Sequence, residues 1–398
     1  MSWITKRLED VADFTLGKML DQRKNRGEPL PYLANVNVRW GTFELDDLRY
    51  MKFESHEVER YSLKYGDIVM CEGGEPGRCA IWKKHQPGMM IQKALHRIRP
   101  HDCLDASYLF YFFLHTGNLG GFAPFLTGAT IKHLPREKLA KIDITFPPRL
   151  IQERISSIMS GYDDLIAINQ CRIALLEESA RLLYREWFVN FRFPGFEQVS
   201  LTNGLPDGWQ TREVCSLVSF LNRGITPKYD ESAKGLVINQ KCIRSGRLNL
   251  NPARRQSKEV KTERLIQLGD ILINSTGAGT LGRVAQVRSQ IEDCTVDTHV
   301  TIARPSTSES ISFLGVALLE LEPTLSSMGV GSTNQLELGR TDIGAIKLLV
   351  PPATLQQEFH SRVWLLFEQV DALVKTNELL AHARNELLPK LMSGAIQV

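Results

Sequence analysis

One segment of the sequence has the spacing of a nucleotide-binding loop. The run Gly277-Ala-Gly-Thr-Leu-Gly282 fits the pattern Gly-x-Gly-x-x-Gly and follows a short apolar run that is typical of a strand. In a dinucleotide-binding fold this loop must open a helix, because the helix N-terminus holds the pyrophosphate. The continuation, Arg283-Val-Ala-Gln-Val287, has the pattern of a second strand. We therefore predict a tight turn between two strands and no cofactor.

Other residue sets that perform catalysis are missing from the sequence. It contains no Walker loop, no Gly-x-Ser-x-Gly turn, no His-Glu-x-x-His motif and no Cys or His residues at metal-binding spacing. The seven cysteines are scattered, which suits a reducing cytoplasm better than a disulfide framework. Phe146 and Val350 precede the two Pro-Pro pairs, which excludes the Asn/Asp-Pro-Pro-aromatic motif of an amino-methyltransferase. We expect no catalytic residue, metal or cofactor, and hence no enzyme.

Basic residues point to binding rather than to catalysis. The net charge of +3 is only a weak sign of a polyanionic partner, but the charge is uneven. Between Arg223 and Arg264 there are eleven Lys or Arg residues and four acidic ones. Such a run is either a solvated surface or a face that contacts phosphates.

The bulk composition indicates a globular protein of two or three domains. The chain has 398 residues, of which 43% are hydrophobic and 23% charged. The first ten residues lack the apolar core of a signal peptide. The most apolar stretch, from Tyr108 to Leu114, is too short to span a bilayer. We expect a soluble protein in the cytoplasm.

A set of short motifs occurs twice in the same order, which indicates a tandem duplication. The matched segments are Trp3 with Trp209, Gly17 with Gly224, Tyr32–Asn35 with Leu236–Asn239, Gly66–Val69 with Gly269–Leu272, Gly77-Arg78 with Gly282-Arg283, Ile98–Pro100 with Ala303–Pro305, Ile142–Pro148 with Ile346–Pro352, and Gln152 with Gln356. Asp67–Cys71 and Asp270–Asn274 are β-branched runs behind a Gly-Asp turn, which predicts strands. A helical pattern lies near Asp105–Leu114, so each copy is predicted to be an α+β module.

A long helix is predicted after each Pro-Pro pair, because the apolar residues there repeat every seven positions. The first helix, from about Arg149 to Phe188, would be about 60 Å long. Matching stripes in one chain favour pairing of the two helices over packing of each on its own module. Asn169 and Asn377 fall within these stripes, where a buried amide can set the register. The stripes comprise Met159, Ile166, Ile173, Ala180 and Trp187; Ile155, Tyr162, Asn169, Leu176 and Leu183; Phe359, Leu366, Leu373, Leu380 and Leu387; and Val363, Val370 and Asn377.

The duplicated set of motifs resembles the specificity subunit of type I restriction–modification systems. The resemblance is carried by Gly-Asp-Ile-(Val/Leu), the Gly-rich turn, Arg-Pro and the Pro-Pro-x-x-x-Gln motif of each module, by Arg185–Phe191 before Leu205–Trp209, and by the ending Leu387–Gly394. It covers essentially the full length of the chain. No single motif is diagnostic, and the ordered pair of sets makes the resemblance specific.

The resemblance implies an architecture and a function. Two α+β target recognition domains would read the halves of an asymmetric bipartite site on double-stranded DNA, and two long helices would form an antiparallel coiled coil that sets the spacer. The helices would recruit two adenine-methylating subunits, with restriction subunits joining for cleavage. The implied division is residues 1–148 for the first recognition domain, 149–195 for the first helix and linker, 196–352 for the second domain, and 353–398 for the second helix.

Candidate DNA contacts are basic and amide side chains on loops, since such groups position phosphates or read base edges. The polar tips Thr127–Thr130 and Ser332–Gln335 occupy matching places and are further candidates. Each candidate could instead be an ordinary exposed charge, and the recurrence of Arg78 and Arg283 could reflect pairing inside the fold. The candidates are Arg23, Lys24, Arg26, Arg39, Arg78, Lys132, Arg223, Lys228, Lys241, Arg244, Arg254, Arg255, Arg283, Asn334 and Gln335.

Two other functions fit parts of the pattern. One is a coiled-coil adaptor that bridges proteins without reading DNA, which only the basic clusters and the resemblance disfavour. The other is the remnant of a fused restriction–modification enzyme, which the missing methylase motifs and the short length disfavour. Selective retention of one duplex from a random library would separate these functions.

Overall fold

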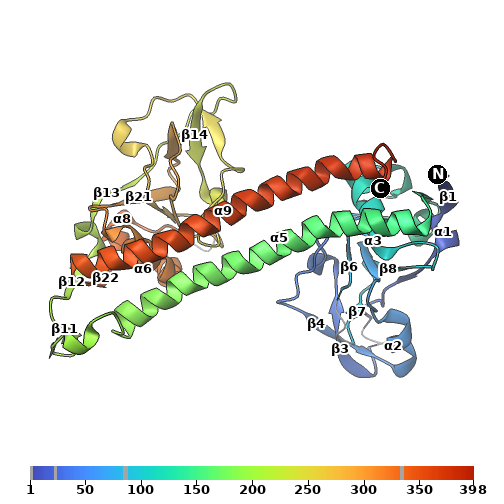
Figure 1. The fold of residues 1–398 in the computed structure, drawn as a ribbon, viewed down its shortest axis with the longest axis horizontal. Helices are drawn as coiled ribbons and strands as arrows, with labels where there is room; N and C mark the ends of the chain where they lie inside the picture. Colours follow the sequence, from blue (N-terminus) through green and yellow to red (C-terminus); the bar gives the residue numbers. More distant parts are fainter. Residues whose placement is uncertain (1–2, 22–24, 84–87, 332–335) are drawn as a thin grey trace. The chain divides into compact units, whose positions relative to one another are not determined.

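Two helices are far longer than any other element that the structure describes (Figure 1). They are α5 (Arg149–Tyr184) and α9 (Ala353–Met392), and each begins directly after a Pro-Pro pair. The structure is a computed structural model that describes residues 3–21, 25–83, 88–331 and 336–398. The chain divides into two compact units, Met1–Ile168 with Asn377–Val398, and Asn169–Thr376. Each unit contains one module and one end of each long helix.

The first module is built on three small sheets. A four-stranded sheet has the order β2-β8-β5-β6, a three-stranded sheet has the order β4-β3-β7, and β1 pairs with β9. The strands are β1 (Ile4–Arg7), β2 (Ala12–Leu16), β3 (Glu28–Leu33), β4 (Arg49–Phe53), β5 (Ile68–Cys71), β6 (Cys79–Ile81), β7 (Met90–Ile91), β8 (Leu95–Pro100) and β9 (Asp143–Phe146). The α-helices before α5 are α1 (Leu8–Val11), α2 (Ser55–Tyr61), α3 (Ala106–Asn118) and α4 (Arg136–Leu139).

The second module repeats this topology. Its sheets have the orders β13-β21-β18-β19 and β17-β14-β20, and β12 pairs with β22. The strands are β12 (Gln210–Glu213), β13 (Val218–Arg223), β14 (Gly235–Ile238), β17 (Arg254–Gln256), β18 (Ile271–Asn274), β19 (Val284–Gln286), β20 (Cys294–Val296), β21 (Val300–Pro305) and β22 (Lys347–Val350). Two further hairpins and three helices complete the unit: β10 (Leu201–Thr202) with β11 (Leu205–Pro206), β15 (Ile243–Arg244) with β16 (Arg247–Leu248), α6 (Ser310–Glu320), α7 (Glu322–Ser327) and α8 (Arg340–Gly344).

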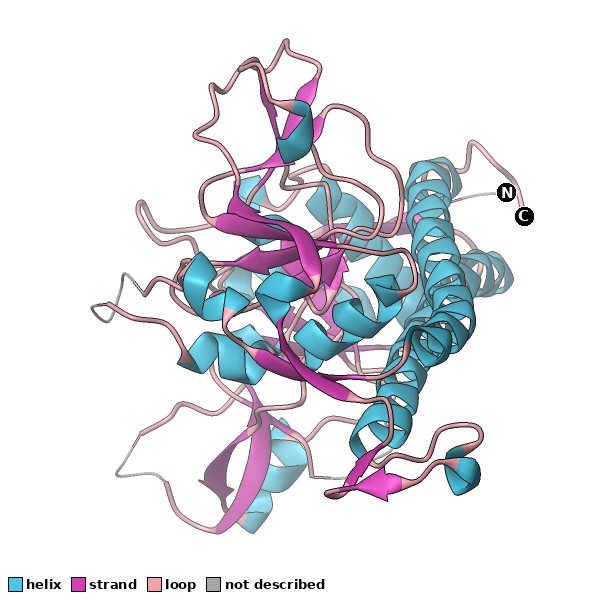
Figure 2. Cartoon of the chain, turned by 90° about the vertical axis from the view of Figure 1, so that its left-hand side faces the viewer, coloured by secondary structure: helices cyan, strands magenta, loops and turns pink. Residues whose placement is uncertain are grey.

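Strand pairing confirms the duplication. Leu8 N donates to Ile142 O, and Val214 N donates to Ile346 O, each at 2.9 Å. Short strands and helices are mixed throughout both modules, so the protein is α+β as predicted (Figure 2). The two predicted strands are β5 and β18, and the predicted helix is α3, whose first turn is capped by Asp105 accepting from Tyr108 N.

The alignment of one segment was wrong by one residue. Gln92 N donates to Leu33 O, and Asp297 N donates to Ile238 O, so Leu33 and Ile238 are equivalent. The segment Tyr32–Asn35 therefore matches residues 237–240 instead of Leu236–Asn239. Matching asparagines caused the error: the two 3-10 turns that follow begin at Asn35 and at Gln240.

The Gly-x-Gly-x-x-Gly segment is a turn between two strands, as predicted. It joins β18 to β19, which pair antiparallel with Ile273 opposite Val284. Gly277, Gly279 and Gly282 all have positive φ angles, which glycine adopts without steric cost. The loop is followed by a strand and opens no helix, so it lacks the helix N-terminus that would bind a pyrophosphate.

The long helices complete the core of each unit. In the first unit Ile155 and Met159 of α5 and Leu388 and Leu391 of α9 pack with the four-stranded sheet and α3. In the second unit Trp187 and Phe359 pack with α6 and the corresponding sheet. A helix with a wide apolar stripe must bury that stripe, and the modules supply much of the surface.

The ends of α5 and α9 run antiparallel within each unit. In the first unit Arg384 pairs with Asp163, and Asn377 donates to Ile166 O at 3.4 Å. In the second unit Tyr184 and Trp187 contact Phe359. Residues of the predicted stripes are buried or half-buried, as the heptad pattern requires, and Asn169 is buried with them.

Within the described residues no helix has both the length and the apolar character needed to cross a bilayer.

Candidate nucleic-acid interface

A buried ion pair explains two of the repeated motifs. Asp67, from the first Gly-Asp-Ile, accepts two hydrogen bonds of 2.7 Å from Arg99, the Arg of the first Arg-Pro. Asp270 accepts two of 2.8 Å from Arg304 in the second module. Both carboxylates are almost fully buried. The motifs therefore hold the scaffold together, and bound ligands must be sought elsewhere.

A glutamine explains the third repeated motif. Gln152 Nε2 donates to Pro147 O at 2.9 Å and to Cys103 O at 3.1 Å, and its Oε1 accepts from Asp105 N. Gln356 Nε2 likewise donates to Pro351 O at 2.8 Å. In Pro-Pro-x-x-x-Gln the glutamine thus fixes the carbonyl that precedes each long helix. Because interior carbonyls need partners, this amide sets how each helix leaves its module.

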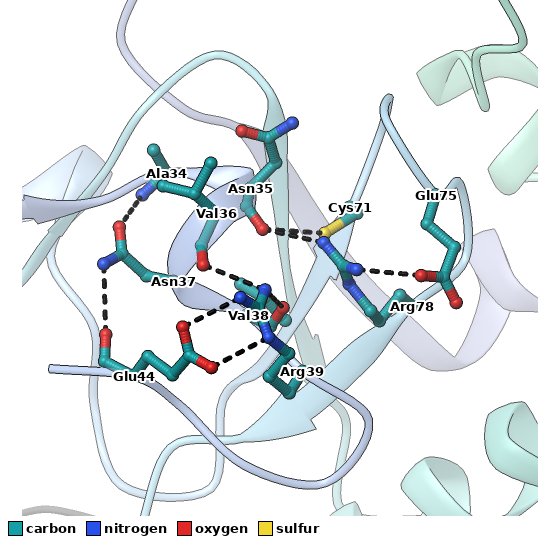
Figure 3. A network of polar contacts seen from close by, with 10 residues as sticks. All are labelled: Ala34, Asn35, Val36, Asn37, Val38, Arg39, Glu44, Cys71, Glu75 and Arg78. Carbon is teal, nitrogen blue, oxygen red and sulfur yellow. Dashed lines mark hydrogen bonds and ion pairs between the residues drawn. The ribbon is translucent and has the colours of Figure 1, made fainter. Parts of the chain in front are cut away.

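Arg39 and Arg78, two predicted DNA contacts, have partners inside the first module (Figure 3). Arg39 donates to both carboxylate oxygens of Glu44 at 3.0 and 2.8 Å and to two backbone carbonyls. Arg78 donates to Asn35 O at 2.9 Å and to Glu75 at 2.8 Å. Arg78 therefore serves the fold of the first module.

Three candidates of the second module also have internal partners. Arg223 pairs with Glu337 and donates to Leu338 O. Arg255 donates to Ala233 O at 2.9 Å, and Arg283 donates to Gly279 O at 2.9 Å. The backbone bonds of Arg255 and Arg283 leave several guanidinium N–H groups unused, whereas the carboxylate of Glu337 also neutralises Arg223.

The side chains of five exposed candidates form no hydrogen bond or ion pair with the described parts of the chain. They come from loops or strand ends, where cations are accessible to a polyanion. The negative charge of Asp230 acts on Lys228, and water solvates these exposed cations, so phosphates could bind them with release of water and counterions. These candidates are Arg26, Lys132, Lys228, Lys241 and Arg244.

The base of a hairpin occupies the same place in each module. Thr127 and His133 exchange two backbone hydrogen bonds in the first module, and Val330 and Glu337 do so in the second. The next residue is tied to the four-stranded sheet in both modules, because Leu134 N donates to Glu72 O and Leu338 N to Ser275 O. The candidates Arg23, Lys24, Asn334 and Gln335 lie outside the described residues.

Arg254 differs from the other candidates, because its guanidinium stacks on an aromatic ring. Its Cζ lies 3.5 Å from the centroid of the Tyr229 ring. Tyr229 is not among the candidates predicted from the sequence. The sequence does place Tyr229 directly after the basic residue Lys228. Its stacking on Arg254 could not be predicted, because the two residues are brought together only by the fold.

A half-buried ionic cluster, also missed, attaches the second module to the long helices. Arg288 stacks on Phe367 of α9 at 3.6 Å from the ring centroid. Arg247 of β16 pairs with Glu177 of α5 at 3.2 Å. Burial raises the pKa of Glu177 and of Asp371, while nearby arginines oppose that shift. The residues are far apart in sequence, so no spacing rule predicts the cluster.

Comparisons with known proteins agree with this architecture. The family model of the type I restriction modification DNA specificity domain matches residues 2–178. The specificity subunit of the type I restriction enzyme MjaIX of Methanocaldococcus jannaschii is 25% identical over 415 residues, which cover 100% of this chain and 94% of the relative. The putative MjaX specificity subunit of the same organism is 21% identical, with the same two coverages.

A solved structure matches the fold over nearly the whole length. It is the S subunit of the type I restriction–modification system from M. genitalium, with a TM-score of 0.59 and 16% sequence identity. The match covers 98% of this chain and 96% of that chain. Residues 2–178 belong to the family of type I restriction modification DNA specificity domains. Over its whole length the chain is similar to specificity subunits of type I restriction enzymes.

Proposed function

We propose that this protein reads a bipartite, asymmetric sequence on double-stranded DNA for a type I restriction–modification complex. The observation that carries the proposal is the duplication itself. The modules share buried scaffold groups such as the Asp67–Arg99 and Asp270–Arg304 pairs, but they differ in the exposed loops. Identical scaffolds with different surfaces are what the reading of two unrelated half-sites requires.

The long helices act as a spacer between the half-sites and as a docking site for partner subunits. We assign residues 1–148 and 196–352 to the two recognition domains, and 149–195 and 353–398 to the helices of an antiparallel coiled coil. Half-site spacing on a duplex is a distance requirement, which a rigid helix pair can meet. Two methylating subunits bind the specificity subunit, and restriction subunits join the full complex. Asn169 and Asn377 are proposed to set the helix register.

Within this complex the specificity subunit supplies binding and positioning, while the methylating and restriction subunits supply the chemistry. It needs no cofactor for that role. We place it in the cytoplasm with the DNA that it reads, and its seven free cysteines suit a reducing compartment.

The DNA contacts divide into two kinds. Arg26, Lys132, Lys228, Lys241 and Arg244 are proposed to bind phosphates, because they are exposed and carry no internal ion pair within the described chain. Arg255 and Arg283 retain free donors for the same role. Arg39, Arg78 and Arg223 have partners inside the fold, and DNA contact by these three arginines stays a prediction. The same holds for Arg23, Lys24, Asn334 and Gln335.

Selection of duplexes from a random library tests the proposal. The complex of this chain with its methylating subunits should retain one bipartite sequence, while the methylating subunits alone should retain none. Retention of no preferred sequence would leave the adaptor as the better function. The affinity should also fall by roughly 10³ or more between 50 and 200 mM salt, as about six to ten phosphate contacts require. A flat salt response would remove the electrostatic argument.

A further inference from the structure

We propose that Arg254 and Tyr229 form a base-reading element of the second module. The guanidinium of Arg254, held against the Tyr229 ring, donates to the edge of one base pair in the half-site that this module binds. The inference rests on the proposed DNA-reading function, and goes beyond it by naming the side chains that discriminate.

The stacked pair is fixed by backbone hydrogen bonds on both sides. Arg254 lies in β17 opposite Val237 of β14. On the outer side of β17, Ser257 N donates to Lys228 O at 2.9 Å and Asp230 N donates to Arg255 O at 3.2 Å. Tyr229 therefore lies in an added strand-like segment beside β17. The two side chains therefore start from backbone positions that are set before any ligand binds.

Both side chains are open to solvent. Tyr229 is 45% exposed, and Arg254 is an exposed residue of β17. The side chain of Arg254 forms no hydrogen bond or ion pair with the described residues, and the Tyr229 ring covers only one face of its guanidinium. All five N–H donors, which lie in the plane of the guanidinium, stay available to a ligand.

This combination suits a base edge better than a phosphate. A planar guanidinium held at fixed orientation matches the two acceptors of guanine in the major groove, whereas flexible lysines suffice for phosphates. Pre-organisation also reduces the conformational entropy lost on binding. Lys228 and Lys258 flank the pair, and Lys258 Nζ donates to Thr226 O at 3.1 Å. An open groove beside β17 is lined by Lys234 and Lys258 and also by Glu259 and Asp293. These lysines are placed to bind the adjoining backbone.

The first module carries the same position with a different neighbour. The register places Arg49 opposite Tyr32, as it places Arg254 opposite Val237, and Tyr32 and Val237 are equivalent once the alignment is corrected. The following residue is Tyr50 in the first module and Arg255 in the second, and both are exposed. The arginine thus recurs in both modules, and the exposed residue that follows it is the one that differs between them.

Three variants of the full chain, each in complex with the methylating subunits, test the inference: Arg254→Ala, Arg254→Lys and Tyr229→Leu. Each is measured against the selected duplex and against duplexes with every base pair of both half-sites replaced in turn. Arg254→Ala should lower the discrimination at one base pair of the second half-site by about tenfold to a hundredfold. Arg254→Lys should lose the same discrimination despite keeping its charge. Tyr229→Leu, which removes only the ring support, should weaken it less.

The control is Lys347→Ala, which removes an exposed cation from β22, on a different sheet of the same module. It should change nothing at either half-site, and none of the variants should alter the first half-site or the spacer. A loss that is uniform over all sequences and is restored by Arg254→Lys would identify a phosphate contact and overturn the inference. Unchanged discrimination in Arg254→Ala would overturn it too. Both results leave DNA reading intact, whereas absence of sequence preference in the wild type refutes the proposed function itself.

Discussion

Arg304 donates two hydrogen bonds of 2.8 Å to Asp270, a carboxylate with no solvent exposure, while Asp270 also accepts from Gln267 N at 2.8 Å. Asp67 has the same partners in the first module, namely Arg99 and Lys64 N. The same Asp–Arg pair thus occurs in both modules although their sequences differ at most positions, so we infer that the pair is a structural feature of this module.

Removing one partner of this pair should destabilise one module. In Asp270→Asn the guanidinium of Arg304 keeps its charge but loses its carboxylate, and breaking a buried pair costs about 3–5 kcal/mol. The free energy of unfolding of the second unit, measured by hydrogen exchange of β18 and β21 amides, should fall by about that amount. Amides of β5 and β8 should be unaffected. A change below about 1 kcal/mol would show that Asp270 is not needed for stability.

The two glutamines should differ in importance. Gln152 makes three hydrogen bonds and Gln356 one that the structure records, so Gln152→Leu leaves more buried groups unpaired. Each unsatisfied buried group costs about 1–3 kcal/mol. Denaturant unfolding should therefore show a larger loss for Gln152→Leu than for Gln356→Leu. Equal losses would contradict the capping role derived for Gln152.

A proline in the middle of α9 should separate folding of the modules from assembly of the complex. Leu373→Pro removes a helical hydrogen bond and clashes with the preceding turn, at a cost of about 3 kcal/mol or more. Far-UV circular dichroism should show lost helix, and co-purification with methylating subunits and spacer preference should change. Leu373→Ala, which keeps the helix, is the matched control. Unchanged assembly and spacer preference in Leu373→Pro would count against the spacer role.

His96 should make the first unit sensitive to mild acid. It is fully buried, its Nε2 lies 2.8 Å from Leu134 O, and its Nδ1 has no partner within the described residues. Burial lowers the pKa of His96 below its ordinary value. As the pH falls, His96 is therefore protonated in the unfolded chain before it is protonated in the folded one. The free energy of unfolding keeps its full value above about pH 6.5 and decreases as the pH drops toward the lowered pKa.

Substitution of this histidine isolates its effect from that of other groups. In His96→Gln an amide can still donate to Leu134 O, but it does not titrate. Hydrogen exchange of β5 and β8 amides at pH 7.5 and 5.0 should show a smaller loss of stability in the variant than in the wild type. An identical pH dependence in both proteins would mean that His96 is not responsible.

Much of the architecture could be predicted because local patterns set it. The Gly-Asp turns, β-branched runs and heptads specify strands and helices through backbone and packing preferences that act over a few residues. Duplication made these weak signals strong, since Leu8–Ile142 and Val214–Ile346 repeat the same pairing. Where the copies share only one identity, as around Asn35 and Asn239, the alignment slipped by one residue.

The sequence by itself determined the two α+β modules, the long helices and the resemblance to specificity subunits of type I restriction enzymes. Tertiary structure decided which cations have partners inside the fold. Arg223 resembles Arg254 in sequence, yet Glu337 pairs with the first while the Tyr229 ring supports the second. Partners 25 or more residues away, as Tyr229 is from Arg254, meet only through strand register. A charge is therefore free or used according to contacts that local sequence does not encode.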